Sequence, residues 1–124
     1  MRIYLPATVS AVRAALAAGS MPVRSGVGFA VTAPLRLEYP DWSEEDLEYL
    51  AMQDASRASL RLLASAQDGE PSLRVVVAAD LDDALITPRP EADRAVVAVR
   101  GAVDWPSVAA VHIDGEEFVL NGTL

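Results

Sequence analysis

The chain has 124 residues, a formal net charge of −8 and no cysteine. Its length fits one domain with a workable core, and the lack of cysteine excludes a disulfide, a thiolate zinc site and a cysteine nucleophile. All ten basic residues are arginine, which excludes lysine chemistry such as a Schiff base, and the acidic balance disfavours nucleic-acid binding.

The first predicted elements alternate between strands and helices. Residues 2–5 form a short strand, and the next helix has Thr8 as its N-cap and Gly19 as its C-cap. Residues 27–32 predict a second strand. Residues 73–79 predict a third, and their near-continuous apolar run is typical of a strand buried on both faces.

A long helix is predicted over residues 43–66, between the second and third strands. Its apolar arc has a centre of small side chains, which favours close packing on a flat sheet. The predicted buried residues are Ala55, Ala58 and Leu62. The opposite, polar face is expected to include Gln53, Asp54, Arg57 and Arg61.

Glu48 interrupts the apolar arc of this helix. The favoured interpretation is that the first helical turn overhangs the sheet edge and leaves Glu48 solvated, because charged residues are seldom buried unpaired. The alternative is a carboxylate at the rim of a cleft. There a cation or an arginine would have to compensate its charge.

The β-α-β-α-β order predicts that the first three strands are parallel, because crossover connections join parallel strands. Residues 84–94 read as an extended surface segment, and residues 95–100 as another strand. Residues 110–113 and 117–120 predict a hairpin around Asp114-Gly115. The expected fold is a single α/β domain over residues 1–124, with a mixed sheet, two main helices and one thinly covered sheet face.

The carboxyl ends of parallel strands share one sheet edge, which is the usual ligand crevice of open α/β folds. Thr8, Thr32 and Asp80 follow the three predicted parallel strands, and the start of the long helix brings Glu48 nearby. These four residues form the candidate ligand site. Its two carboxylates favour a cation or a hydroxyl-bearing ligand over a phosphate.

Two further features carry weaker signals. The segment Asp80-Leu81-Asp82-Asp83 superficially resembles the start of haloacid-dehalogenase phosphatases, but it lacks the expected downstream residues, and a turn capped by Asp80 or a simple Mg²⁺ site are the alternatives. The single histidine, His112, alternates with Val111 and Ile113 and should face away from them. We therefore expect no metal centre and no cofactor.

Six segments together resemble a known family: 1–8 (MRIYLPAT), 29–32 (FAVT), 47–49 (LEY), 57–63 (RASLRLL), 74–80 (RVVVAAD) and 108–114 (VAAVHID). The chain is similar there to a family of small uncharacterised actinobacterial proteins. The match spans most of the chain and implies a bacterial cytosolic origin. The resemblance implies no activity, so no residue role transfers.

Two functions compete. The favoured one is a non-enzymatic cytosolic protein that acts by association, as a homodimer or with another protein. The reasons are that the sequence contains no recognisable catalytic motif and that one sheet face is expected to be thinly covered. The alternative is a small enzyme or a small-molecule or metal binder with its site at the predicted strand ends. We expect neither a signal peptide nor a membrane span, because no apolar run approaches the ~18 residues that a span requires.

Overall fold

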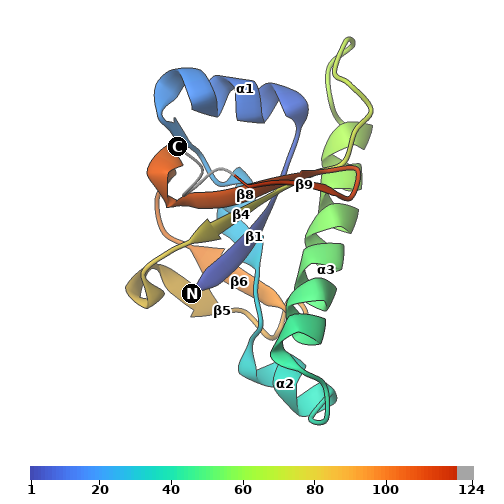
Figure 1. Ribbon diagram of the computed structural model, residues 1–124, viewed down its shortest axis with the longest axis vertical. Coiled ribbons are helices and arrows are strands. Elements are labelled where there is room, and N and C mark those ends of the chain that lie inside the picture. Colours follow the sequence, from blue (N-terminus) through green and yellow to red (C-terminus); the bar gives the residue numbers. More distant parts are fainter. Residues whose placement is uncertain (120–124) are drawn as a thin grey trace.

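Residues 1–119 are described by a computed structural model and form a seven-stranded sheet with helices on both faces (Figure 1). The helices are α1 (Val9–Ala18), α2 (Ala33–Glu38) and α3 (Glu44–Ala64). The main sheet contains β1 (Arg2–Ala7), β3 (Val27–Phe29), β4 (Val75–Asp80), β5 (Ile86–Pro88), β6 (Val96–Val99), β8 (Val108–Ile113) and β9 (Glu116–Val119). A second, two-stranded sheet pairs β2 (Ser20–Met21) with β7 (Val103–Asp104). Short 3₁₀ helices span Arg24–Gly26, Asp83–Leu85 and Trp105–Ser107.

The strands of the main sheet follow the order β5-β6-β3-β1-β4-β8-β9. All the pairings between neighbouring strands in the described part of the chain are antiparallel. The predicted parallel β-α-β-α-β start was therefore wrong. The coarser expectation of a mixed α/β fold is confirmed, and the structure adds a third helix, α2, to the two main helices expected.

The unexpected direction of β3 arises between α1 and β3. There β2 pairs with β7 instead of entering the main sheet, and Ser25 (φ 59°) and Gly26 (φ 65°) occupy the left-handed region in succession. The chain thereby turns, and β3 enters the sheet antiparallel to β1. Because β3 and β4 both run antiparallel to β1, they point in the same direction, and α2 and α3 join two parallel strands that have β1 between them.

Both faces of the sheet carry a core, because strand residues alternate between the two faces. On one face, Tyr4 and Ala78 pack with Leu47, Ala51 and Ala55 of α3. On the other face, the core contains a larger set of aliphatic side chains from β1, β4, β6, α1 and the small sheet: Ile3, Leu5, Val77, Val97, Ala15, Met21 and Val103. α3 thus packs on the sheet face opposite to the face that α1 covers (Figure 1).

Small side chains bring α3 close to the sheet, as predicted. Ala55 and Ala58 are buried, whereas Leu62 is only partly buried and Arg57 is exposed. The expected exposure of Asp54 was wrong, because its side chain is buried and forms an ion pair with Arg57. Helical periodicity alone could not reveal this burial, because it depends on segments outside α3. The charges of Asp93 and Arg94, in the turn before β6, lie close enough to influence the pKa of Asp54.

Predictions that rest on local chemistry were confirmed. Thr8 caps α1, whose C-terminus ends at Gly19 with φ 81°. The turn at Asp114-Gly115 has φ 50° and 90°, and it joins β8 to β9. The predicted second hairpin strand ended at Leu120, which lies outside the described residues. The extended segment predicted over residues 84–94 instead contains β5, which pairs with β6 at the sheet edge.

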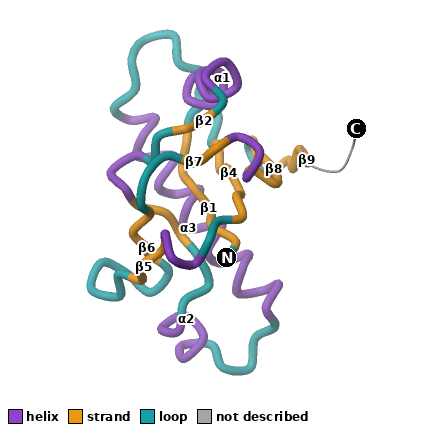
Figure 2. Tube along the Cα trace, turned by 90° about the vertical axis from the view of Figure 1, so that its left-hand side faces the viewer, coloured by secondary structure: helices purple, strands orange, loops and turns teal. Residues whose placement is uncertain are grey.

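The β8–β9 hairpin extends beyond the cover that α3 provides. α3 packs on β1, β4 and β3, and all four residues of β9 are exposed. Figure 2 shows β9 as the outermost strand on its side of the molecule. One face of the sheet is thus fully covered at its centre and open at this edge. Among the described residues, no helix is long and apolar enough to cross a membrane.

Candidate functional site

The antiparallel sheet separates Thr8 from Asp80, two of the four residues predicted as a ligand site. β1 ends at Ala7 beside Val75, the first residue of β4, so Thr8 lies at the start of β4. Asp80 ends β4 beside Arg2, at the opposite end of the β1–β4 pair. Thr8 and Asp80 therefore do not share a crevice, and a ligand role for these residues stays a prediction.

Both threonines of the predicted site are buried helix caps. The hydroxyl oxygen of Thr8 accepts a hydrogen bond from the backbone nitrogen of Ala11 at 3.2 Å. The hydroxyl of Thr32 accepts one from the backbone nitrogen of Leu35 at 3.3 Å and donates one to the carbonyl oxygen of Arg94. Each hydroxyl satisfies backbone groups that a helix terminus leaves free.

Both predicted carboxylates lie near Arg2. Its guanidinium forms two hydrogen bonds to Asp80, of 2.6 Å and 3.1 Å, and this bonding holds the pKa of Asp80 below its usual value. The nearby negative charge of Glu48 adds a smaller contribution to the raised pKa of Arg2. Burial and then Glu48 raise the pKa of Tyr4 to about 12. Glu48 is thus half-buried beside an arginine, which offsets the cost of its charge.

A groove runs between α3 and the β8–β9 hairpin, on the sheet face that α3 covers. It consists of two adjoining hollows, of about 220 and 230 Å³, that both reach Tyr49, Met52 and His112. We call it the α3–hairpin groove and define it by residues from five elements: Arg2, Tyr4, Glu45, Glu48, Tyr49, Met52, Val76, His112 and Glu117.

His112 lies on the floor of the α3–hairpin groove. Its predicted orientation is confirmed, because Val111 packs in the core on the opposite sheet face. Burial lowers the pKa of His112, while Glu117, whose carboxylate lies 3.7 Å from the ring, partly opposes that effect. The alternation of β8 predicted which way His112 points. The groove itself went unpredicted, because it depends on where α3 stops covering the sheet.

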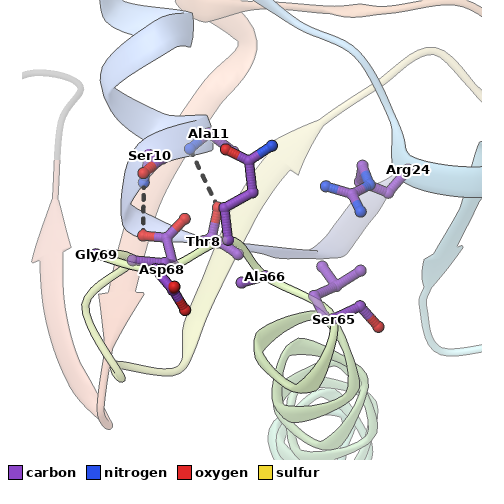
Figure 3. A pocket seen from close by; sticks show the side chains of 11 residues that line it. Thr8, Ser10, Ala11, Arg24, Ser65, Ala66, Asp68 and Gly69 are labelled. Atoms are coloured by element: carbon purple, nitrogen blue, oxygen red, sulfur yellow. Dashed lines mark hydrogen bonds between the residues drawn. The ribbon is translucent and has the colours of Figure 1, made fainter.

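A second pocket, of about 590 Å³, lies where the start of α1 meets the loop after α3 (Figure 3). Thr8 and Ser10 line one side, and Arg24 faces them across the opening. The carboxylate of Glu70 accepts a hydrogen bond from the backbone nitrogen of Ser10 at 3.3 Å. The helix N-terminus, which favours negative charge, therefore already holds a carboxylate of the same chain.

The acidic segment after β4 forms a turn and contacts cationic groups. Asp82, rather than the predicted Asp80, caps the turn by accepting a hydrogen bond from the backbone nitrogen of Ala84 at 3.0 Å. Asp83 lies 3.1 Å from the amino group of Met1. Across residues 1–119, no three side chains of histidine, cysteine, aspartate or glutamate are grouped to hold a metal ion.

The chain was compared with protein families, with curated proteins and with solved structures. No curated protein matches the chain, and no solved structure does. A model of a family of unknown function, DUF6912, matches residues 1–121. That match covers nearly the whole sequence and agrees with the resemblance to an uncharacterised family. The chain belongs to the DUF6912 family, a family of unknown function.

Proposed function

We propose that the protein acts by association with another polypeptide, as a homodimer or with a different protein, and that the α3–hairpin groove is the contact surface. One observation carries this proposal. Tyr49 of α3 is 56% exposed beside an edge strand, β9, whose Val119 is 50% exposed. The proposal includes the cytosolic location expected from the sequence.

The residues of the groove suit a protein contact. An exposed tyrosine offers a large, rigid apolar surface with a polar tip, and tyrosine is enriched among residues that dominate binding energy. Met52 lies one turn further along α3 and adapts its shape to varied partners. The open edge of β9 also presents backbone groups without a neighbouring strand among the described residues.

Sedimentation velocity tests the homodimer. If two copies associate through the groove, the wild type has twice the monomer mass at micromolar concentrations and Tyr49→Glu has the monomer mass, because a charge at the contact has to be desolvated. Leu37→Glu is the matched control, since Leu37 is 81% exposed on α2, away from the groove. If the wild type is a monomer, only association with a different protein remains. If Leu37→Glu dissociates the dimer as strongly as Tyr49→Glu, the contact surface lies elsewhere.

A second function, binding of a small anion at the pocket beside α1, is favoured by the Glu70 carboxylate that the N-terminus of α1 already holds. An external carboxylate would have to displace Glu70 and contact Arg24. A thermal-shift titration with acetate and phosphate is expected to show stronger stabilisation of Glu70→Gln than of the wild type, and none of Glu70→Gln/Arg24→Gln. Equal shifts in all three proteins would exclude this pocket.

A further inference from the structure

We infer that the α3–hairpin groove binds a basic segment of a different protein rather than a second copy of this chain. The inference rests on the proposed association and names its partner. Three observations support it: the negative charge of the groove, its apolar surface of exposed Tyr49 and partly buried Met52, and the charge of the chain as a whole.

The charge in the groove is negative on balance. Glu45, Glu48 and Glu117 line it. Arg2, which also lines it, and Arg74, which lines the adjoining hollow, are each paired with an aspartate. Arg2 binds Asp80 through two hydrogen bonds, and Arg74 lies 3.6 Å from Asp114. His112 adds little positive charge at neutral pH, because burial lowers its pKa. Among the described residues, none of the three glutamates forms an ion pair with an arginine, because Arg2, the arginine near Glu48, is bonded to Asp80. A cationic group that enters the groove therefore meets carboxylates whose charge is only partly offset.

The apolar surface lies next to these carboxylates. Glu48 and Tyr49 are successive residues of α3, and Met52 follows one turn later, so carboxylate, aromatic ring and thioether line one wall. Lysine and arginine side chains combine an apolar stem with a cationic end. The stem can cover Tyr49 and Met52 while the cationic end reaches Glu48 or the ring face of Tyr49. This combination distinguishes a basic partner from a purely apolar one.

A second copy of the chain is a poor occupant of the same groove. In a twofold dimer the same patch faces itself, so the three glutamates of one copy would approach those of the other. Like charges brought together at a contact cost binding free energy, and each copy carries a net charge of −8. The charge complementarity of the groove thus selects the second of the two associations proposed above.

The single histidine provides a direct probe of the groove. The imidazole protons of His112 give one set of NMR signals, because the sequence has no other histidine. The probes are two synthetic amphipathic peptides, one of leucine and lysine and one of leucine and glutamate. We expect the lysine peptide to shift the His112 signals in a saturable way and the glutamate peptide to leave them unchanged.

Matched substitutions on β9 separate the groove from the general acidity of the protein. Glu117 lies opposite His112, whereas its neighbour Glu116 lies opposite Ile113 on the other sheet face. Glu117→Gln and Glu48→Gln are each expected to weaken binding of the lysine peptide about 2–5-fold, as for exposed ion pairs. Glu116→Gln removes the same charge and is expected to leave the affinity unchanged.

The outcomes distinguish the inference from the proposed function. If the His112 signals move with protein concentration and not with the lysine peptide, association through the groove stands and the basic partner is wrong. If neither titration moves them, the basic-partner inference and the homodimer are both wrong, and only association with a different, non-basic protein remains. Equal effects of Glu116→Gln and Glu117→Gln, or equal binding of the two peptides, would also overturn the basic-partner inference, because binding would then not depend on the groove.

Discussion

The hydroxyl group of Ser59 donates a hydrogen bond to the carbonyl oxygen of Ala7, 2.8 Å away. The same hydroxyl oxygen accepts a hydrogen bond from the backbone nitrogen of Val75 at 3.0 Å. Ala7 and Val75 are the last partners at one end of the β1–β4 pairing. One fully buried side chain of α3 therefore joins the helix to both central strands at the point where their own pairing ends.

We predict that Ser59→Ala destabilises the fold by roughly 2–4 kcal/mol, because it leaves a buried backbone donor and a buried acceptor without a partner. Chemical denaturation followed by circular dichroism measures the change. Ser56→Ala is the control, since Ser56 lies on the same helix but is only partly buried. Similar midpoints for the two variants would mean that the hydrogen bonds of Ser59 contribute nothing beyond those of a surface serine.

Ala58→Leu tests the close approach of α3 to the sheet. Ala58 is buried, and three extra carbons should destabilise the protein by about 1–3 kcal/mol through overpacking. Ala64→Leu provides the control, because Ala64 is exposed in the last turn of the same helix. If Ala58→Leu has the same denaturation midpoint as the wild type, the interface between α3 and the sheet is loosely packed at this position.

Asp54 is expected to lower the stability of the protein at neutral pH. Its burial raises its pKa, although Arg57 opposes this effect. A carboxyl group that binds its proton more tightly in the folded state costs stability as the pH rises from the unfolded pKa through the folded pKa, and the cost persists above both. Asp54→Asn should therefore raise the thermal midpoint at neutral pH, and the gain should vanish at a pH below the unfolded pKa.

The control for this substitution is Asp68→Asn, because Asp68 is exposed in the loop after α3. Its thermal midpoint should follow that of the wild type across the same pH range. A gain from Asp54→Asn that stays constant with pH would point to a cause other than the ionisation of Asp54.

The titration of His112 reports on its burial and on Glu117. An NMR titration should give a pKa below the ordinary 6.5, because burial disfavours the charged ring. Glu117→Gln should lower that pKa further, since the carboxylate of Glu117 favours the charged ring. Glu116→Gln should leave it unchanged, and a pKa at or above the ordinary value would show that the ring is solvated in solution.

The sequence predicted those features that depend on local chemistry. Thr8 and Gly19 delimit α1, and Asp114-Gly115 forms the hairpin turn, because each residue type suits the backbone conformation at its own position. The direction of β3 was not predictable in this way. It depends on a reversal in which Ser25 and Gly26 are both left-handed, a conformation that serine seldom adopts. The Ser25-Gly26 pair indicates a turn, but it does not indicate the direction in which the next strand enters the sheet.

The candidate site was predictable only in part. Glu48 and Asp80 were correctly expected near each other, since the charges of both raise the pKa of Arg2. The signal for Glu48 was its position on the apolar arc of the helix. Thr8 was placed beside Glu48 and Asp80 only because β1 and β4 were predicted to be parallel, whereas they are antiparallel. The groove itself depends on the lateral position of α3 over the sheet. Packing across several elements sets that position, and no single stretch of sequence encodes it.

The central position of β1 has a consequence for synthesis on the ribosome. The strand is synthesised before β3 and β4, and Arg2 has no Asp80 to bind until a further 78 residues have been added to the chain. β3 emerges sooner, but it matches β1 at only one residue pair, Tyr4 with Phe29, whereas β4 matches it along its full length. A nascent chain that stalls before β4 therefore exposes a nearly bare apolar strand, and that interval is when this protein most needs protection from aggregation.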